Sequence, residues 1–223
     1  MAAARRNAEG LTAAFHAKPE RLRDAEGSPS RRDDKDRYET PHEVTTALLA
    51  RFGHLFEAER AVDPCCGTGR ILRSLRRCGF DAAGTDLEED GLDFLSTDYA
   101  DHAHDECLTG ADCVTNPPYR LASQFVDRAL ELFDGRVAML LPADFLWSEA
   151  RRDWLDRAAR PQHVLVIPWR IKFFRRDGTR ISGQAYSHEW VIWPSRGYRT
   201  CTSTQVHWAK VPSAAERRST EQP

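Results

Sequence analysis

The sequence predicts an α/β fold with a doubly wound, seven-stranded sheet that is mostly parallel and carries an antiparallel hairpin at one edge. Two observations support this prediction. From residue 38 onward, short apolar runs alternate with amphipathic helical patterns, which is typical of parallel strands joined by helices. The last two apolar runs, at 163–169 and 187–194, have no helical pattern between them, so we expect them to pair antiparallel.

The ordered part of the chain is expected to begin with a helix within 37–52. Val44 and Leu48 belong to a set of apolar residues that recur there with helical spacing. Thr40 suits the N-cap position, and Pro41 suits the first helical position because its missing N–H would have no helical partner there. We therefore expect this helix to start directly after Thr40.

The remaining elements follow in a regular order. A strand, a glycine-containing turn and an amphipathic helix occupy 60–80. Apolar runs predict the later strands, and helical spacing predicts two later helices. The later strands are expected at 81–87, 91–99, 111–116, 135–142, 163–169 and 187–194, and the later helices at 120–133 and 148–159.

The chain has 223 residues, which suits one domain with short extensions. We expect a flexible arm at 1–37, a domain at 38–195 and a basic tail at 196–223. No apolar stretch approaches the ~20 residues of a membrane helix, and no signal-peptide pattern is seen, so a cytoplasmic protein is expected. The six cysteines lack the spacing of a disulfide framework and fit reduced thiols.

The stretch DPCCGTGR at 63–70 follows the first predicted strand, where α/β sheets bind ligands. Gly67 and Gly69 allow a sharp turn close to a ligand, but the lysine of a triphosphate site is missing. Asp63 would repel a phosphate and attract an amine, while Asp86 suits a ribose diol. S-adenosylmethionine carries both of these groups. An ordinary tight turn with Asp86 as a helix cap is the alternative.

The segment Asn116, Pro117, Pro118 and Tyr119 stops the fourth predicted strand beside this loop. The two prolines remove backbone donors, so the side-chain carbonyl of Asn116 and the backbone carbonyl of Pro117 remain as acceptors. Tyr119 adds a flat ring. Two acceptors beside a ring suit a planar substrate with an NH2 group, whose nitrogen lone pair they would direct toward an electrophile. A rigid loop with a packed tyrosine is the alternative.

In this order, the motifs resemble those of the class I S-adenosylmethionine-dependent amino methyltransferases, which share a Rossmann-like sheet. YETP at 38–41, ahead of the glycine loop, is similar to the pattern of gamma-type adenine-N6 DNA methyltransferases. The small phage and prophage forms are the most similar, on the stretches NPPYRLASQFVDRAL at 116–130, RIKFF at 170–174 and EWVIW at 189–193. The resemblance covers about 38–194. It implies direct methyl transfer from S-adenosylmethionine to N6 of adenine, with Asn116, Pro117, Pro118 and Tyr119 as the catalytic segment.

The resemblance also implies a set of cofactor-binding residues. Thr40 and Pro41 would lie over the methionine end of the cofactor. Asp93 would accept from its adenine amino group, with Asp98 as a rival, and Phe94 would pack against its adenine ring. The expected set is Tyr38, Thr40, Pro41, Asp63, Pro64, Cys65, Gly67, Gly69, Asp86, Leu87, Asp93, Phe94 and Asn116.

The loop 169–187 is the expected nucleic-acid contact. From residue 170 to the end, ten Lys/Arg face four Asp/Glu, which favours a polyanion although a solvated basic surface is the alternative. A flipped base needs a stacking ring, for which Phe174 is the first choice and Phe173 the second, and its phosphates need cations. The expected substrate-binding residues are Arg170, Lys172, Phe173, Phe174 and Arg175. In the alternative, the phenylalanines pack on the sheet.

Several alternatives stay open. Only ~30 residues follow the last predicted strand, too few for the recognition domain that restriction-type enzymes carry. Recognition by the loop or by the arm, and RNA or single-stranded DNA as the substrate, are therefore possible. NPPY also serves glutamine-N5 methylation of proteins, and a non-catalytic module on the same fold is a further alternative.

A metal is not expected. His102, His104, Cys107 and Cys113 lie near one another in the sequence, but their spacing matches no familiar zinc pattern. Methyl transfer to an amine also needs no metal.

Overall fold

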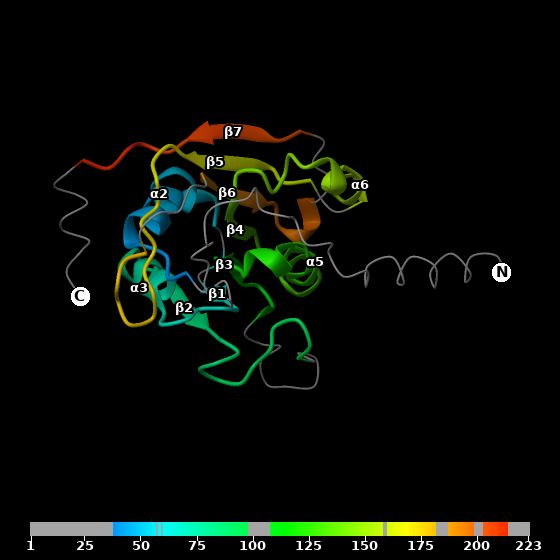
Figure 1. The fold of residues 1–223 in the computed structure, drawn as a ribbon. Coiled ribbons are helices and arrows are strands. Elements are labelled where there is room, and N and C mark those ends of the chain that lie inside the picture. Colours follow the sequence, from blue (N-terminus) through cyan, green and yellow to red (C-terminus); the bar gives the residue numbers. More distant parts are fainter. Residues whose placement is uncertain are drawn as a thin grey trace, which may run out of the picture. The chain divides into compact units, whose positions relative to one another are not determined.

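Seven strands form one mixed sheet in the part of the chain that the structure describes (Figure 1). The computed structural model describes residues 38–56, 58, 60–97, 108–157, 160–181, 187–198 and 203–213, all within the unit Asp33–Pro223. The predicted arm at 1–37 lies outside these residues. The strands are β1 (Arg60–Asp63), β2 (Asp81–Gly84), β3 (Asp112–Thr115), β4 (Val137–Pro142), β5 (His163–Ile167), β6 (His188–Trp193) and β7 (Gln205–Trp208).

The strand order is β2-β1-β3-β4-β6-β5-β7. Strands β2, β1, β3 and β4 pair parallel, and β5 pairs parallel with β7. Strand β6 runs antiparallel to both of its neighbours, β4 and β5. The predicted α/β sheet and the predicted antiparallel pairing of the two late apolar runs are therefore confirmed.

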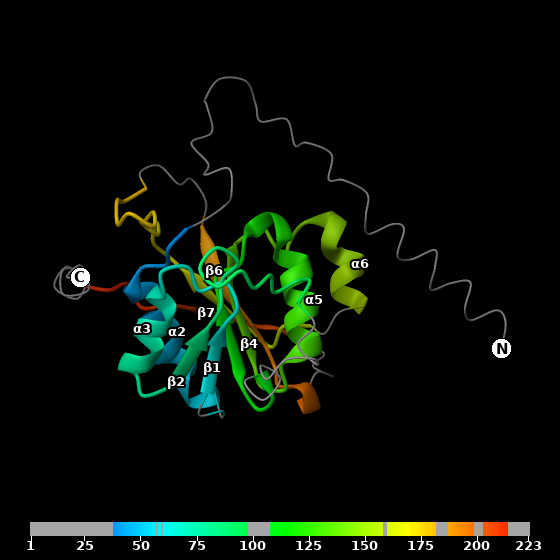
Figure 2. The ribbon, with the colours of Figure 1, turned by 90° about the horizontal axis from the view of Figure 1, so that it is seen from below.

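Helices cover both faces of this sheet (Figure 2). One face carries α2 (His42–Phe52) and α3 (Arg70–Arg77), and the other carries α5 (Ala122–Leu132) and α6 (Glu149–Arg157). The indole N–H of Trp190 on β6 donates to the Val44 carbonyl at 2.9 Å, which fixes α2 on the sheet. None of the helices in the described ranges has the length and apolarity to cross a bilayer.

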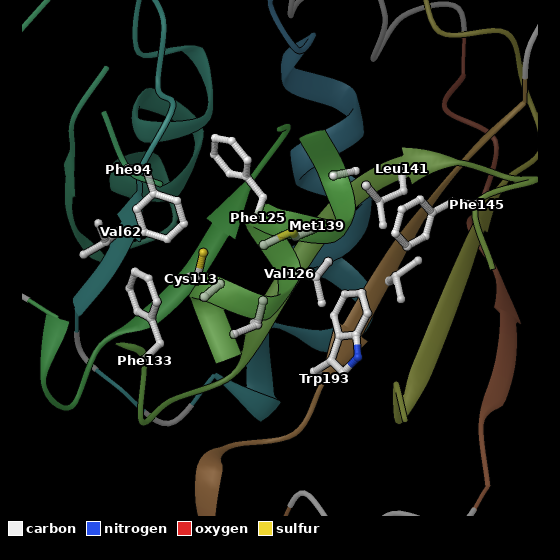
Figure 3. Close-up of a cluster of buried hydrophobic side chains, with 14 of the residues drawn as sticks. Val62, Phe94, Cys113, Phe125, Val126, Phe133, Met139, Leu141, Phe145 and Trp193 are labelled. Atoms are coloured by element: carbon white, nitrogen blue, oxygen red, sulfur yellow. The ribbon is translucent and has the colours of Figure 1, made fainter. Parts of the chain in front are cut away.

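The central strands are buried on both faces, as expected for a parallel sheet covered by helices. Met139 and Leu141 of β4 point into the cluster under α5, where Figure 3 shows Met139 near Val126. Ala138 and Leu140 belong to the cluster on the opposite face, under α2 and α3. The unbroken apolar run of β4, without polar alternation, thus reflects burial from both sides.

The predicted strand over 91–99 is wrong for its described residues, 91–97, which form no strand and include a turn at 94–96. Asp93 explains this result, because its side chain accepts hydrogen bonds from the Leu95 N–H at 3.0 Å and the Ser96 hydroxyl at 2.8 Å. A short acid that bonds to the backbone two residues on favours a turn over a strand. Phe94 is then buried as a core residue.

The sequence did not reveal β7, which lies inside the predicted tail at 196–223. It pairs with β5 through a register that includes Val164 and Val206, so β7 forms the outer edge of the sheet beyond the β5–β6 hairpin. β7 has only four residues, and its Val206 and Trp208 are exposed. Such a short, largely exposed strand leaves little periodic signal.

The predicted N-cap role of Thr40 is also wrong. Helix α2 begins at His42, Pro41 occupies the N-cap position, and no side chain caps the helix. The first turn is closed by a hydrogen bond from the Val44 N–H to the Pro41 carbonyl. The Thr40 hydroxyl is instead directed to a different partner, Asn116.

Candidate active site

A pocket that is partly open to solvent lies at the carboxyl ends of β1, β2 and β3. Asp63 ends β1, Asp86 follows β2, and Asn116 follows β3. Because these strands are parallel neighbours, their ends bring the three side chains to one place. The pocket lining includes Pro118 and seven of the residues expected to bind the cofactor: Tyr38, Thr40, Asp63, Cys65, Gly67, Asp86 and Asn116.

The glycine loop is held in shape by carboxylates from two other segments. The Gly67 N–H donates to Asp86 Oδ2 at 3.0 Å, and the Thr68 N–H and hydroxyl donate to Glu39 at 2.9 and 2.8 Å. Gly67 has a φ of +51°, and a Cβ on it would lie 2.5 Å from the Glu39 carboxylate. Only glycine suits that position.

Glu39 is a candidate functional residue that the sequence motifs did not identify. Its side chain is buried, and its carboxylate lines the pocket beside the glycine loop. It is the second residue of YETP, so the motif contained it, but nothing in the motif indicated a contact with residues after β1. With Asp63 and Asp86, Glu39 makes a third acid in a lining that also holds Arg70 and Arg176, so the acids outnumber the cations there.

The Asp63 carboxyl is 1% exposed and titrates near neutrality. Burial raises its pKa to about 7, and the charges of Asp86 and Glu39 add to the rise. Hydrogen bonds from the Thr115 hydroxyl at 2.6 Å and the Cys65 N–H at 3.2 Å oppose it. A cation in the pocket would therefore favour the ionised form of Asp63.

Cys65 and Cys66 line the pocket as neutral thiols. Burial raises the pKa of Cys65 well above its usual range and the pKa of Cys66 to about 12, and the Asp63 charge adds to both shifts. The Cys65 Sγ lies 2.9 Å from the Thr115 hydroxyl. Neither thiol is an activated nucleophile, because nucleophilic attack by cysteine requires the thiolate.

Asn116 is oriented by two hydrogen bonds that leave its side-chain carbonyl unused. Its Nδ2 donates to the Tyr38 carbonyl at 2.9 Å and to Thr40 Oγ1 at 3.0 Å. The Tyr38 carbonyl can only accept, so the amide must present its nitrogen there. Within the described part of the chain, Asn116 Oδ1 is buried and has no hydrogen-bond partner. An unsatisfied buried acceptor costs about 1–3 kcal/mol, which is explained if a ligand group satisfies it.

Four aromatic rings surround this acceptor segment. The Tyr119 ring lies 6.1 Å from the Tyr38 ring, nearly parallel to it, and 5.6 Å from the His188 ring. Phe173 contacts both Tyr38, at 5.7 Å, and His188, at 5.0 Å. Tyr119 is half-buried, as a ring that offers a face to a flat substrate must be, whereas Phe173 is fully buried.

The predicted base-stacking role of Phe173 therefore disagrees with its burial, because its ring packs in the core. Phe174 is half-buried, but two guanidinium groups lie against its ring. The Cζ atoms of Arg70 and Arg180 are 4.1 and 5.4 Å from the ring centroid. A base that stacks on the ring face next to Arg70 would have to displace that guanidinium. Adjacent residues of an extended segment point to opposite sides, and sequence could not tell which phenylalanine faces the core.

The predicted cations lie on a short hairpin, 170–181. Its two arms are joined by hydrogen bonds from the Arg175 N–H to the Thr179 carbonyl and from the Ile181 N–H to the Phe173 carbonyl. The hairpin also pairs with the YETP segment through two backbone hydrogen bonds between Glu39 and Phe174, at 2.9 and 3.1 Å. The side chains of three predicted substrate-binding residues are exposed on it: Arg170, Lys172 and Arg175.

Other predicted residues do not line this pocket. Leu87 is 60% exposed, and Phe94 packs against Phe125 and Phe133, with ring centroids 5.2 and 6.5 Å away. The expected packing of Phe94 on an adenine ring is therefore not supported, and Asp98 lies outside the described residues. The expected cofactor and catalytic residues outside the lining are Pro41, Pro64, Gly69, Leu87, Asp93, Phe94, Pro117 and Tyr119.

The described residues contain no group of three or more His, Cys, Asp or Glu side chains arranged to hold a metal. Cys113 is fully buried in the cluster under α5. His102, His104 and Cys107 lie outside the residues that the structure describes.

Comparisons with known proteins identify the fold. No family model matches the chain, and no curated protein matches it. One similar solved structure is a Listeria monocytogenes protein assigned as a class I S-adenosylmethionine-dependent methyltransferase, with a TM-score of 0.52, 10% identity and coverage of 87% of this chain and 71% of that one.

A second is an assigned modification subunit of a type I restriction enzyme from Vibrio vulnificus. It has a TM-score of 0.53 and 14% identity, and the match covers 95% of this chain. This chain spans only 52% of that subunit. At such identities the comparisons establish architecture alone: the chain has the seven-stranded, Rossmann-like α/β fold of the class I methyltransferases.

Proposed function

We propose that this protein transfers the methyl group of S-adenosylmethionine to an exocyclic amine of a planar substrate, namely N6 of adenine in DNA. The single observation that carries the proposal is the unsatisfied Oδ1 of Asn116 in a pocket lined by Asp63 and Asp86. An acceptor fixed in that place needs a donor, and an NH2 group is a donor of the right kind.

The residues of the pocket fit S-adenosylmethionine. Asp63 and Glu39 provide negative charge for its ammonium group, and Asp86 provides acceptors for its ribose hydroxyls. The three acids of the lining outnumber its two arginines, Arg70 and Arg176, which disfavours the several negative charges of a nucleotide triphosphate. The cofactor supplies an electrophilic methyl group on a sulfonium sulfur.

In this proposal, Asn116 acts by orienting the amine. Its Oδ1, together with the Pro117 carbonyl, accepts the two amine hydrogens and so withdraws the nitrogen lone pair from the ring. Tyr38 and Thr40 keep the Asn116 side chain from rotating. Positioning of this kind contributes strongly to catalysis, because the reacting atoms must be aligned before the barrier is crossed. The proton that the methylated nitrogen loses leaves to solvent.

DNA is supported by charge and, more weakly, by the comparison. The exposed cations of the hairpin 170–181 can contact phosphates. The assigned activity of one structural neighbour, a restriction-enzyme modification subunit, also concerns DNA. The half-buried ring of Tyr119 is the proposed stacking surface for the base, in place of Phe173.

A methyl-transfer assay tests this function. The protein is incubated with methyl-labelled S-adenosylmethionine and, separately, with duplex DNA, single-stranded DNA, RNA and a glutamine-containing protein substrate. We expect label on DNA, at N6 of adenine after digestion to nucleosides. Label on RNA alone or on protein alone would reject the DNA assignment, and binding of S-adenosylmethionine without transfer to any substrate would favour a non-catalytic module.

A further inference from the structure

Arg176 lies in the turn of the hairpin 170–181 and is the one residue of this hairpin that contributes to the described pocket lining. The first arm of the hairpin is fixed to one wall of the pocket through the backbone pairing of Phe174 with Glu39. Its turn reaches the opposite wall, which follows β2. The hairpin therefore connects two walls of the pocket.

At the opposite wall, the Arg176 guanidinium binds three acids. Its nitrogens lie 2.8 Å from Glu88 Oε2, 2.7 Å from Glu89 Oε1 and 3.3 Å from Asp86 Oδ1. Arg176 and Asp86 are half-buried, and the side chain of Glu88 is 30% exposed. A guanidinium with five N–H donors suits such a multidentate contact better than an ammonium does.

This contact competes with the role proposed for Asp86. Its Oδ2 accepts from the Gly67 N–H, and its Oδ1 accepts from the Glu88 N–H at 3.0 Å and from Arg176. Ribose hydroxyls would have to replace one of these donors. The contact from Arg176 is the longest of the three, and Arg176 alone keeps other partners, Glu88 and Glu89, after it releases Asp86.

We propose that the turn of this hairpin, residues 175–179, is a lid at the edge of the pocket and that Arg176 is the positioning residue that latches it. The proposal rests on the proposed function in taking S-adenosylmethionine as the ligand. Arg176 holds the lid closed through Glu88 and Glu89. When the ribose binds, Arg176 releases Asp86, and a ribose hydroxyl donates to Asp86 in its place. A ligand beside the closed lid should leave more slowly while Arg176 stays bound to its acids.

Dissociation kinetics test the latch. Labelled S-adenosylmethionine is bound to the full chain and then chased with an excess of unlabelled S-adenosylmethionine. We expect R176A to release the label about fivefold faster than the native protein, a modest effect in keeping with half-exposed ion pairs. R176K keeps the charge and should restore part of the slow release. R60A is the matched control, because it also breaks an Arg–Asp pair, with Asp81, but at the opposite ends of β1 and β2.

Hydrogen exchange separates failure of the latch from failure of the proposed function. In the protein without ligand, R176A should lose amide protection over the turn 175–179 relative to R60A, while α2 and α5 stay protected. If native protein binds no S-adenosylmethionine, the proposed function fails, yet this exchange measurement still decides whether Arg176 fixes the hairpin. Equal protection of 175–179 in R176A and R60A would overturn the latch, as would unchanged release by an R176A protein that binds S-adenosylmethionine.

Discussion

The two walls of the pocket are held by different kinds of interaction. On the wall that follows β3, Asn116 is fixed by uncharged hydrogen bonds to the Tyr38 carbonyl and the buried Thr40 hydroxyl. On the wall that follows β2, ion pairs join Arg176 to acids of which Glu89 is about half exposed. One wall is therefore shielded from water, and the other is not.

This difference indicates which wall of the pocket has to be rigid. Buried hydrogen bonds keep their geometry and do not respond to salt, whereas exposed ion pairs contribute about 0–1 kcal/mol each and are screened. The wall that would orient the reacting amine is the fixed one. The wall that would admit the cofactor is held by contacts that break easily. Substitutions on the two walls should therefore affect different steps.

The largest effect is expected from Asn116→Ala. Without the carbonyl acceptor, the amine loses its orientation, and kcat should fall by about 10²-fold or more. The Kd for S-adenosylmethionine should change little, because the carboxylates that bind it remain. Single-turnover methyl transfer and equilibrium binding measure the two quantities, with the exposed Gln124→Ala as the matched amide control. An Asn116→Ala protein with most of its activity would contradict the proposed mechanism.

Asp63→Asn should have the next largest effect, on binding instead of turnover. The pKa of Asp63 is about 7 in the free protein, so its carboxyl is neutral below and ionised above that pH. Affinity for the ammonium of S-adenosylmethionine should therefore rise from pH 6 to pH 8. Asp63→Asn should remove this rise and weaken binding about tenfold at pH 8. Calorimetric titrations at several pH values check this, with exposed Asp81→Asn as the control.

The raised pKa of Asp63 also predicts how the stability of the protein changes with pH, and this can be tested without a ligand. The folded protein binds this proton more tightly than the unfolded chain, whose carboxyl titrates near 3.8. This contribution to stability is therefore lost as pH rises from about 4 through 7. If Asp63→Asn left the slope of Tm against pH in this range unchanged, relative to Asp81→Asn, the assigned burial of Asp63 would be wrong.

Thr40→Val is expected to have a smaller effect than Asn116→Ala on the same wall. It keeps the side-chain shape but removes one of the two acceptors of Asn116 Nδ2, while the Tyr38 carbonyl remains. We expect kcat to fall about fivefold, in line with one lost hydrogen bond. Thr46→Val, an exposed change on α2, is the control. An effect as large as that of Asn116→Ala would indicate that Thr40 does more than orient the amide.

The smallest effect is expected from salt, and it should appear only on the other wall. Raising ionic strength screens the Arg176 ion pairs, so release of S-adenosylmethionine should become about twofold faster in the native protein. R176A should show no such increase. Chase experiments at low and high potassium chloride measure it. Equal salt dependence in the two proteins would mean that Arg176 does not control release.

Much of the fold could be predicted because its strands are apolar and its helices amphipathic. The runs that became β4 and β6 are buried on both faces, and burial leaves a plain signal in sequence. The stretch around Asp93 misled the prediction because an acid that bonds to nearby backbone overrides a weak strand pattern. Short, exposed β7 left too little pattern to detect.

The residues of the candidate site that could be predicted from the sequence are those that lie within a single motif. Asp63, Gly67 and Asn116 lie in motifs whose chemistry can be read locally, and all of them line the pocket. Glu39 and Arg176 were missed because their roles depend on pairing between segments distant in the chain. A sequence pattern does not state which distant residues meet, so it also could not distinguish buried Phe173 from half-buried Phe174.

The pairing of Glu39 with Phe174 has a consequence for the order in which the protein folds. During synthesis, the chain can emerge with β1 to β4 and their helices before residue 174 exists. Joining such distant segments carries a large loop-closure cost, and contacts of this kind form late. The surroundings of the glycine loop are therefore completed only after the last third of the chain has been synthesised. A nascent chain that stops before the hairpin would have most of its sheet but only part of its pocket.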